Sequence, residues 1–217
     1  MRFSSWGSRG IASACVAFVC AAGAGDALAD SAEERADITI YRGQGVDANL
    51  LDVLPKLAKG TLDYDPTFFT GAAWHVPLAT PGWMQSFFSW LGAPGTKTGV
   101  EMIAVKHEGL QENWEADVAY VFRFAPFRFW GISVRGGVGF GLSEAFGTPT
   151  YEDGPRGNRE RRYKFQNYDA YELDWRLDSA PRWALVTRIH HRSGIFGVIA
   201  PRYVGSNFLA VGVRYAY

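Results

Sequence analysis

Hydrophobic and polar residues alternate along most of the chain beyond the first thirty residues, and a period of two is the repeat of a β-strand. Between Trp114 and Phe124 the even positions are apolar or aromatic, whereas the odd positions include Glu115, Asp117 and Arg123. Each such segment has one apolar face with aromatic ends and one face of charged or small residues. The pattern predicts about eight strands, at residues 36–43, 66–78, 97–107, 113–124, 127–142, 163–177, 182–194 and 205–217.

Two folds accommodate strands of this kind. In a soluble β-sandwich the apolar face is the core. In a transmembrane barrel the apolar face meets lipid, aromatic residues form girdles at both interfaces, and charges point inward. The aromatic strand ends favour the second fold, and no later stretch is apolar enough for a membrane helix. We therefore expect an all-β fold, an eight-stranded antiparallel transmembrane β-barrel with a side-chain-filled interior.

The inward faces of that barrel would carry a mixture of acidic and basic side chains that neutralise one another. An interior filled in this way argues against general porin activity. The expected interior residues are Glu115, Asp117, Arg123, Arg135, Glu172, Asp174, Arg176, Arg188 and Arg214.

Residues 1–29 have the features of a cleaved secretory signal peptide. Basic residues precede an apolar stretch that is too short to span a membrane, and the segment ends in Ala27-Leu28-Ala29, which matches a signal-peptidase site. Cleavage there would leave residues 30–217 as a single barrel domain. Both cysteines lie in the leader, so the expected mature chain has no thiol, disulfide or cysteine metal ligand.

The end of the chain indicates where the protein goes. The last six residues, from Gly212 to Tyr217, resemble the C-terminal signal of outer-membrane barrels. We expect the barrel assembly machinery to be a partner through Tyr217, and the bacterial outer membrane to be the location.

The 22 Lys and Arg residues balance 22 Asp and Glu residues, so bulk charge gives no reason to expect a nucleic acid partner. The oligomeric state is left open.

Loop lengths predict the orientation, because short turns of such barrels lie on the periplasmic side. The short connections at 125–126 and 178–181 place segment 143–162 outside. The basic residues at its end would contact the anionic phosphates of lipopolysaccharide, or they form a solvated loop base. They are Arg156, Arg159, Arg161, Arg162 and Lys164. We also expect a short interfacial helix at 81–92 on the periplasmic side and a helical turn within 48–59 outside.

The strand at 182–194 carries the residues that could carry out a reaction. Its odd positions face lipid, so His191 and Ser193 lie on the outer wall near the external end, whereas His190 and Arg192 point inward. Polar groups are costly on a lipid-facing wall. An imidazole beside a hydroxyl can act as the base for a serine nucleophile.

Such a base needs a third group to orient it. Two residues have the required parity: Asn207 at the external start of the last strand, and Asp169 near the external end of the strand at 163–177. Parity does not choose between them. The alternatives are that His191 and Ser193 are polar interfacial residues, and that Ser206 and Asn207 only form a turn.

The histidines do not predict a metal site. Neighbouring residues on a strand face opposite ways, so His190 and His191 cannot both join His75 and His107 around one ion. We expect no metal and no organic cofactor.

The triplet His191-Arg192-Ser193 on the penultimate strand, followed by a glycine-containing loop and a last strand, resembles the lipid A 3-O-deacylase family. The resemblance covers residues 182–217 by motif and the remainder by architecture. It implies an eight-stranded outer-membrane barrel with a Ser-His-Glu triad on its outer wall. In this family the enzyme removes an ester-linked acyl chain from lipid A.

Two positions depart from the family pattern. The family has Asn after the serine, where this chain has Gly194, so the oxyanion hole would use backbone N–H groups near Gly194. The family's glutamate lies twelve residues after the serine, where this chain has Gly205. A loop two residues longer puts Asn207 at that position. The functional hypotheses are therefore an ester hydrolase acting on lipid A, or a non-catalytic small barrel that binds lipopolysaccharide or stabilises the envelope.

Overall fold

The computed structural model describes residues 35–152, 162–201 and 204–217. The expected signal peptide at 1–29 lies outside the described residues, as do Arg156, Arg159 and Arg161 of the basic cluster. Arg162 and Lys164 lie within them.

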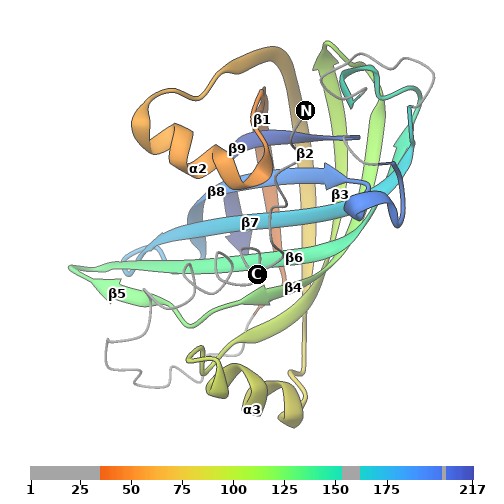
Figure 1. Ribbon diagram of the computed structural model, residues 1–217. Helices are drawn as coiled ribbons and strands as arrows, with labels where there is room; N and C mark the ends of the chain where they lie inside the picture. Colours follow the sequence, from red (N-terminus) through yellow and green to blue (C-terminus); the bar gives the residue numbers. More distant parts are fainter. Residues whose placement is uncertain (1–34, 153–161, 202–203) are drawn as a thin grey trace, which may run out of the picture.

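Eight long antiparallel strands close into a barrel (Figure 1). Neighbouring strands pair in the order β4-β3-β2-β1-β9-β8-β7-β6, and β4 pairs with β6 to close the ring. The long strands are β1 (Asp37–Val46), β2 (Tyr64–Leu78), β3 (Lys97–Gly109), β4 (Trp114–Arg123), β6 (Ile132–Phe146), β7 (Phe165–Leu177), β8 (Trp183–Ser193) and β9 (Gly205–Ala216). The predicted fold class is confirmed.

The segment predicted as a fifth strand at 127–142 is broken by a tight turn. A three-residue strand, β5 (Phe127–Phe129), pairs with the start of β6, and Trp130 and Gly131 form the turn with φ of 44° and 77°. Two consecutive positive φ angles are typical of the turns that connect hairpins. The aromatic run hid this turn because Trp130 continues the alternation while its side chain is 97% exposed. Strand β6 in turn extends to Phe146, beyond the predicted end.

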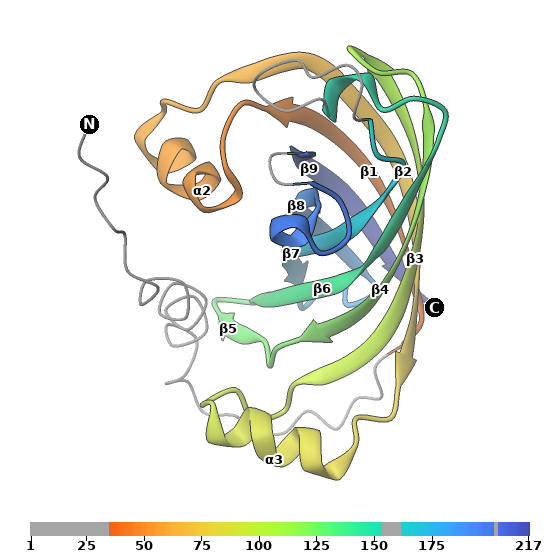
Figure 2. The same cartoon turned by 45° about the vertical axis from the view of Figure 1, so that its right-hand side comes forward.

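Two helices mark opposite ends of the barrel (Figures 1 and 2). Helix α2 (Leu50–Lys59) connects β1 to β2, and α3 (Gly82–Trp90) connects β2 to β3. Following the orientation expected from the sequence, we call the end with α2 the outer end and the end with α3 the inner end. Neither helix in the described part of the chain is long and apolar enough to span a membrane.

The barrel interior is filled with ion pairs and aromatic rings. Glu172 accepts hydrogen bonds from Arg188 and Arg214 at 2.6–2.9 Å, and Asp37 accepts one from Arg123 at 2.5 Å. Tyr41, Phe69, Tyr168 and Phe208 pack among the charged groups. Seven of the predicted interior residues are buried, whereas Arg135 and Arg176 are partly exposed beside Asp174. Every buried charge named here has an oppositely charged neighbour, as stability in a low-dielectric interior requires.

The outer wall has the opposite character. Its exposed side chains between the two ends are mainly aliphatic and aromatic, as expected for a surface in contact with lipid. Near the inner end, Phe88 of α3 packs on the outward-facing Phe122 with 5.3 Å between ring centroids, and Tyr120 and Phe140 extend this aromatic group. This supports the expectation that the helix at 81–92 lies at a membrane interface.

Candidate active site on the outer wall

Strand register brings four of the sequence-predicted site residues together near the outer end. Asp169 of β7 lies opposite His191 of β8, which lies opposite Asn207 of β9. The next row outward contains Ser193, opposite Gly205. The short turn after β7 fixes this register, because a slip of one residue would turn every side chain to the other face.

Asn207 holds the His191 ring. The Oδ1 atom of Asn207 lies 2.7 Å from Nδ1 of His191, and its Nδ2 donates a hydrogen bond to the Ala48 carbonyl at 2.7 Å. A carbonyl oxygen can only accept, so the Ala48 contact assigns the orientation of the amide. His191 Nδ1 then carries the proton and donates to Asn207. The Nε2 atom keeps a lone pair and can act as a base.

Asp169 flanks the same ring from the other neighbouring strand. Its carboxylate interacts electrostatically with His191. Among the described residues, no hydrogen bond joins Asp169 to the imidazole. The geometry therefore gives the orienting contact to Asn207 and leaves Asp169 as a nearby negative charge.

Ser193 faces the same side of the wall as His191. Two residues along a strand separate their Cα atoms by roughly 6.6 Å. Within the part of the chain that the structure describes, no hydrogen bond joins the Ser193 hydroxyl to His191. Catalytic hydrogen bonds are often long before substrate binds, so this geometry does not exclude a serine–histidine pair.

The turn after Ser193 is compact and strained. The N–H groups of Gly197, Ile199 and Ala200 donate to the Gly194 carbonyl at 3.1–3.2 Å. A β-carbon at Gly194 would collide with the Ala200 carbonyl. Ile195 has a φ of 45°, an unfavourable value for a β-branched residue. Strain of this kind often marks functional sites. Because three amides of the turn already bind Gly194, an oxyanion would need other N–H groups of this turn.

On the face of this wall that points into the barrel, the strands are held by a residue that the sequence analysis missed. Glu152 is fully buried and accepts two hydrogen bonds from Arg192 at 2.7 Å, one from Ser206 at 3.1 Å and one from Gln166 at 2.5 Å. Glu152 belongs to a 3-10 turn, Thr150–Glu152, in the loop after β6. The loop thereby ties the inward-facing neighbours of His191 and Asn207 to one carboxylate. No local pattern marks Glu152, since its partners come from three distant segments.

The preceding residue, Tyr151, links that loop to β2. Its hydroxyl donates a hydrogen bond to Asp65 at 2.6 Å. Burial, together with the hydrogen bond to Asp65, raises the pKa of the Tyr151 hydroxyl. The hydroxyl therefore stays protonated and keeps donating to Asp65 at any pH in the ordinary working range.

His190 and His191 lie on opposite faces of β8, as their parity predicts. His75 lies beside Asp37, and His107 and His190 share Glu115 at 3.0 and 2.7 Å. One group that sequence reasoning missed has donor atoms within 4.8 Å of one another and could hold a metal ion in the interior: Glu115, Asp117 and His190. Arg192 lies 3.2 Å from Glu115 and would oppose a cation there, so the group carries no metal assignment.

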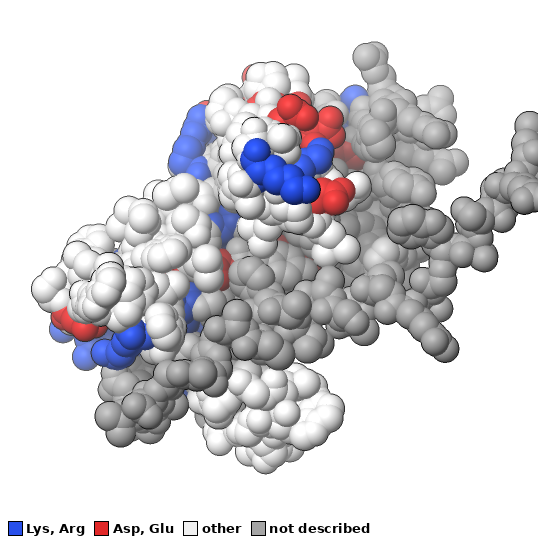
Figure 3. All heavy atoms as spheres, turned by 60° about the vertical axis from the view of Figure 1, so that its left-hand side comes forward, with Lys and Arg blue, Asp and Glu red and all other residues white. Residues whose placement is uncertain are grey.

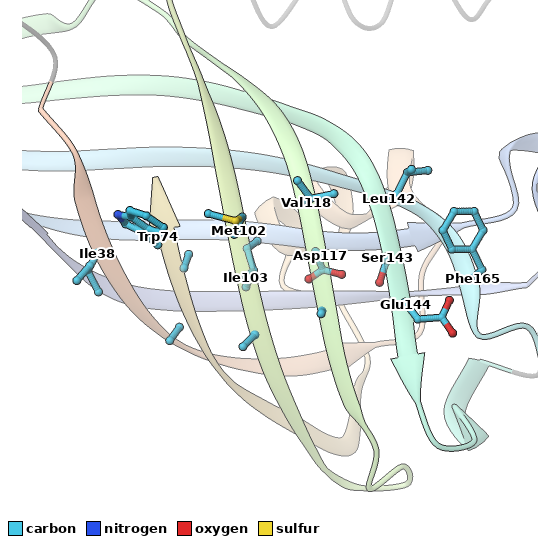
Figure 4. Close-up of a pocket in the computed structure, with 14 residues that line it drawn as sticks. Ile38, Trp74, Met102, Ile103, Asp117, Val118, Leu142, Ser143, Glu144 and Phe165 are labelled. Atoms are coloured by element: carbon cyan, nitrogen blue, oxygen red, sulfur yellow. The ribbon is translucent and has the colours of Figure 1, made fainter. Parts of the chain in front are cut away.

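The other predicted or possible sites are the basic cluster and a hollow on the barrel surface. Of the basic cluster, Lys164 is tied to the site by its backbone, whose carbonyl accepts a hydrogen bond from Arg192 at 2.6 Å. A shallow apolar hollow of about 720 Å³ lies on the opposite wall, between residues such as Trp74, Met102 and Phe165 (Figure 4). The strand order places it across the barrel from β8. The catalytic candidates are not among its lining residues.

Comparisons with known proteins support the fold and do not assign a family. No protein-family model matches the sequence, and no curated protein matches it at a significant level. The crystal structure of the outer membrane enzyme PagL is similar, with a TM-score of 0.54 and 11% identity over 83% of this chain and 99% of that one. This chain has the fold of an outer-membrane β-barrel. The N-terminal β-barrel domain of Pseudomonas aeruginosa OprF aligns with a TM-score of 0.45 and 5% identity over 85% of this chain and 98% of that one.

Proposed function

We propose that this barrel is an ester hydrolase that removes an ester-linked acyl chain from lipid A in the outer leaflet. The observation that carries the proposal is the 2.7 Å contact between His191 and Asn207 on the lipid-facing wall, one row from Ser193. The likeness of the fold to an outer-membrane enzyme is consistent with it. The resemblance of the His191-Arg192-Ser193 triplet to lipid A 3-O-deacylases supplies the substrate class.

The proposed chemistry needs only side chains and water. His191 Nε2 takes the proton of Ser193 as Oγ attacks the ester carbonyl, and backbone N–H groups of the turn at Gly194 stabilise the oxyanion. The imidazolium then gives its proton to the departing sugar hydroxyl, which leaves an acyl-serine. His191 then takes a proton from water as the water attacks the acyl-serine, and the imidazolium returns this proton to Ser193 Oγ as the fatty acid leaves.

Asn207 and Asp169 have different parts in this scheme. Asn207 keeps His191 in the tautomer and orientation that leave Nε2 free, as the asparagine of Cys-His-Asn proteases does. A neutral amide does not balance the charge of an imidazolium. The carboxylate of Asp169, on the neighbouring strand, supplies a negative charge next to the same ring.

A non-catalytic barrel that binds lipopolysaccharide is the second candidate. The observation that favours it is that no hydrogen bond joins Ser193 to His191 among the described residues. In that case the polar row would face headgroups and serve only for binding.

Mass spectrometry of lipid A decides between the two. Cells that express the wild-type protein should lose one ester-linked acyl chain from lipid A, and cells that express Ser193→Ala or His191→Ala should keep it. Thr187→Ala is the matched control, since Thr187 lies on the outward parity of the same strand and outside the site. Unchanged lipid A with the wild-type protein, or an equal loss with Ser193→Ala, would exclude the hydrolase.

A further inference from the structure

Helix α2 is strongly amphipathic, although a helix in an external loop has no need of an apolar side. At 100° per residue, its leucines and Val53 occupy one side, while Asp52, Lys56 and Lys59 occupy the other. Figure 3 faces this region and shows charged side chains gathered on the upper part of the molecule, where α2 lies. A helix with one leucine-rich side and one charged side that carries two lysines is suited to a membrane interface.

The helix packs against the outside of the barrel wall. Val53 is fully buried in a cluster with Val46, Leu62 and Ile189, and Tyr171 and Leu209 pack against this cluster. Tyr171, Ile189 and Leu209 form one row across three strands, directly beside the row of Asp169, His191 and Asn207. They lie two residues nearer the inner end of the barrel. The helix therefore lies beside the lipid-facing wall and reaches below the level of the site.

The remaining apolar side of α2 is uncovered. Leu51, Leu54 and Leu57 are 63%, 42% and 40% exposed. They continue the surface of a wall that already faces lipid. The acyl chains around the barrel are therefore the groups that would cover these leucines. A separate protein partner would have to displace that lipid first.

The charged side of the helix matches the polar part of the same leaflet. Lys56 and Lys59 lie in the last turn, and Lys56 donates a hydrogen bond to the Asp47 carbonyl at 3.3 Å. Ammonium groups at this level would lie among the phosphates of lipid A, while the leucines lie among its acyl chains.

The same loop also touches the proposed catalytic residues. The Ala48 carbonyl, two residues before α2, accepts the hydrogen bond that orients Asn207. A helix seated in the leaflet would hold this carbonyl in place, and through Asn207 it would hold His191. Docking of the helix and orientation of the base are thus connected through a short piece of backbone.

We propose that α2 is a docking helix for outer-leaflet lipid A. Its leucine edge inserts among the acyl chains and guides one of them along the wall toward Ser193, and its lysines bind the phosphates. The guiding role rests on the proposed hydrolase, whereas insertion into the leaflet does not.

The first experiment measures insertion without reference to activity. The native cysteines, Cys15 and Cys20, both lie in the expected leader, so Leu54→Cys and Asp52→Cys each introduce a single label site on opposite sides of α2. The protein is labelled with a fluorophore and reconstituted in bilayers that contain lipid A and acyl-chain spin-labelled lipid. We expect strong quenching at position 54 and weak quenching at position 52. Equal quenching at both positions would overturn the docking helix, whatever the enzyme does.

The second experiment measures guidance. Leu51→Ser/Leu54→Ser is compared with Leu110→Ser, which changes a leucine of similar exposure (48%) in the turn between β3 and β4. We expect the double variant to hydrolyse lipid A in bilayers about tenfold more slowly than wild type. Hydrolysis of a short-chain soluble ester should stay within about twofold, because the reacting groups are unchanged. Equal loss on both esters, or no loss on either, would overturn guidance.

A failure of the proposed function gives a separate result. If the wild-type protein hydrolyses neither lipid A nor the soluble ester, the hydrolase is wrong and guidance falls with it. The quenching at positions 54 and 52 then still decides whether α2 docks in the leaflet.

Discussion

Asn207 makes two hydrogen bonds in opposite directions, to His191 and to the Ala48 carbonyl. An asparagine can satisfy both contacts at once, because its amide has one acceptor end and one donor end. A carboxylate at this position would bind the imidazole and meet the carbonyl oxygen of Ala48 unfavourably. The amide is therefore suited to a place where an external loop closes over a histidine.

Asn207→Ala tests the orienting contact. The variant leaves His191 free to rotate and to change tautomer, so we expect kcat for ester hydrolysis to fall by about a hundredfold or more. KM should change little. The measurement is steady-state kinetics in detergent micelles, with Thr187→Ala as the control on the adjacent strand. Undiminished kcat would show that Asn207 does not position the base.

Asp169→Asn tests the charge on the other side of the ring. The substitution keeps the shape and removes only the negative charge, so kcat should fall by about tenfold, which corresponds to roughly 1.4 kcal/mol. The same assay serves. A larger fall than in Asn207→Ala would reverse the two roles and make Asp169 the orienting residue.

At the scale of elements, the loops of the outer end are parts of the site and not only connections. The loop after β6 brings Glu152 to Arg192 and Ser206 on the inside of the wall, and the loop after β1 brings Ala48 to Asn207 on the outside. Strands β8 and β9 are thus held from both faces beside the catalytic candidates.

Glu152→Gln tests the inner contact. The variant leaves the buried guanidinium of Arg192 with Glu115 as its remaining carboxylate neighbour at 3.2 Å. Breaking a buried ion pair costs about 3–5 kcal/mol, and we expect a loss of about 2–3 kcal/mol in the free energy of unfolding, since Glu115 compensates in part. Urea unfolding in detergent or bilayers measures it. Glu112→Gln, on an exposed residue, is the control and should change stability by less than about 0.5 kcal/mol. The same midpoint for both variants would contradict this account.

At the scale of the whole molecule, alternation predicted the strands and the parity of their residues, and the leader, the aromatic strand ends and the terminal strand favoured the barrel over a sandwich. Period two separates the faces at every position, so Glu172 and Arg214 could be assigned to the interior and His191 to the wall from the sequence. The partners inside the barrel could not be predicted. Arg123 and Asp37 are 86 residues apart and meet only because the ring closes between β4 and β6.

The parts of the site that sequence reasoning missed lack a local pattern. Ala48 acts through its backbone carbonyl, which leaves no trace in the residue type. Glu152 lies in an irregular loop and acquires its role from Arg192, forty residues along the chain. The turn at Trp130 was hidden because an aromatic residue satisfies the alternation as well as a strand residue does. Asn207 was found because strand parity and the family resemblance both indicated it, but its orientation needed the Ala48 contact.

The most direct test of the central claim is covalent labelling of the nucleophile. A fluorophosphonate ester forms a stable bond only with a serine whose hydroxyl is activated by a neighbouring base. The protein in lipid A bilayers is treated with the probe, digested, and mapped by mass spectrometry. We expect one modified residue, Ser193, in wild type and in Thr187→Ala, and almost no modification in His191→Ala. Absence of a label on Ser193 in the wild-type protein, or equal labelling in His191→Ala, would contradict the account.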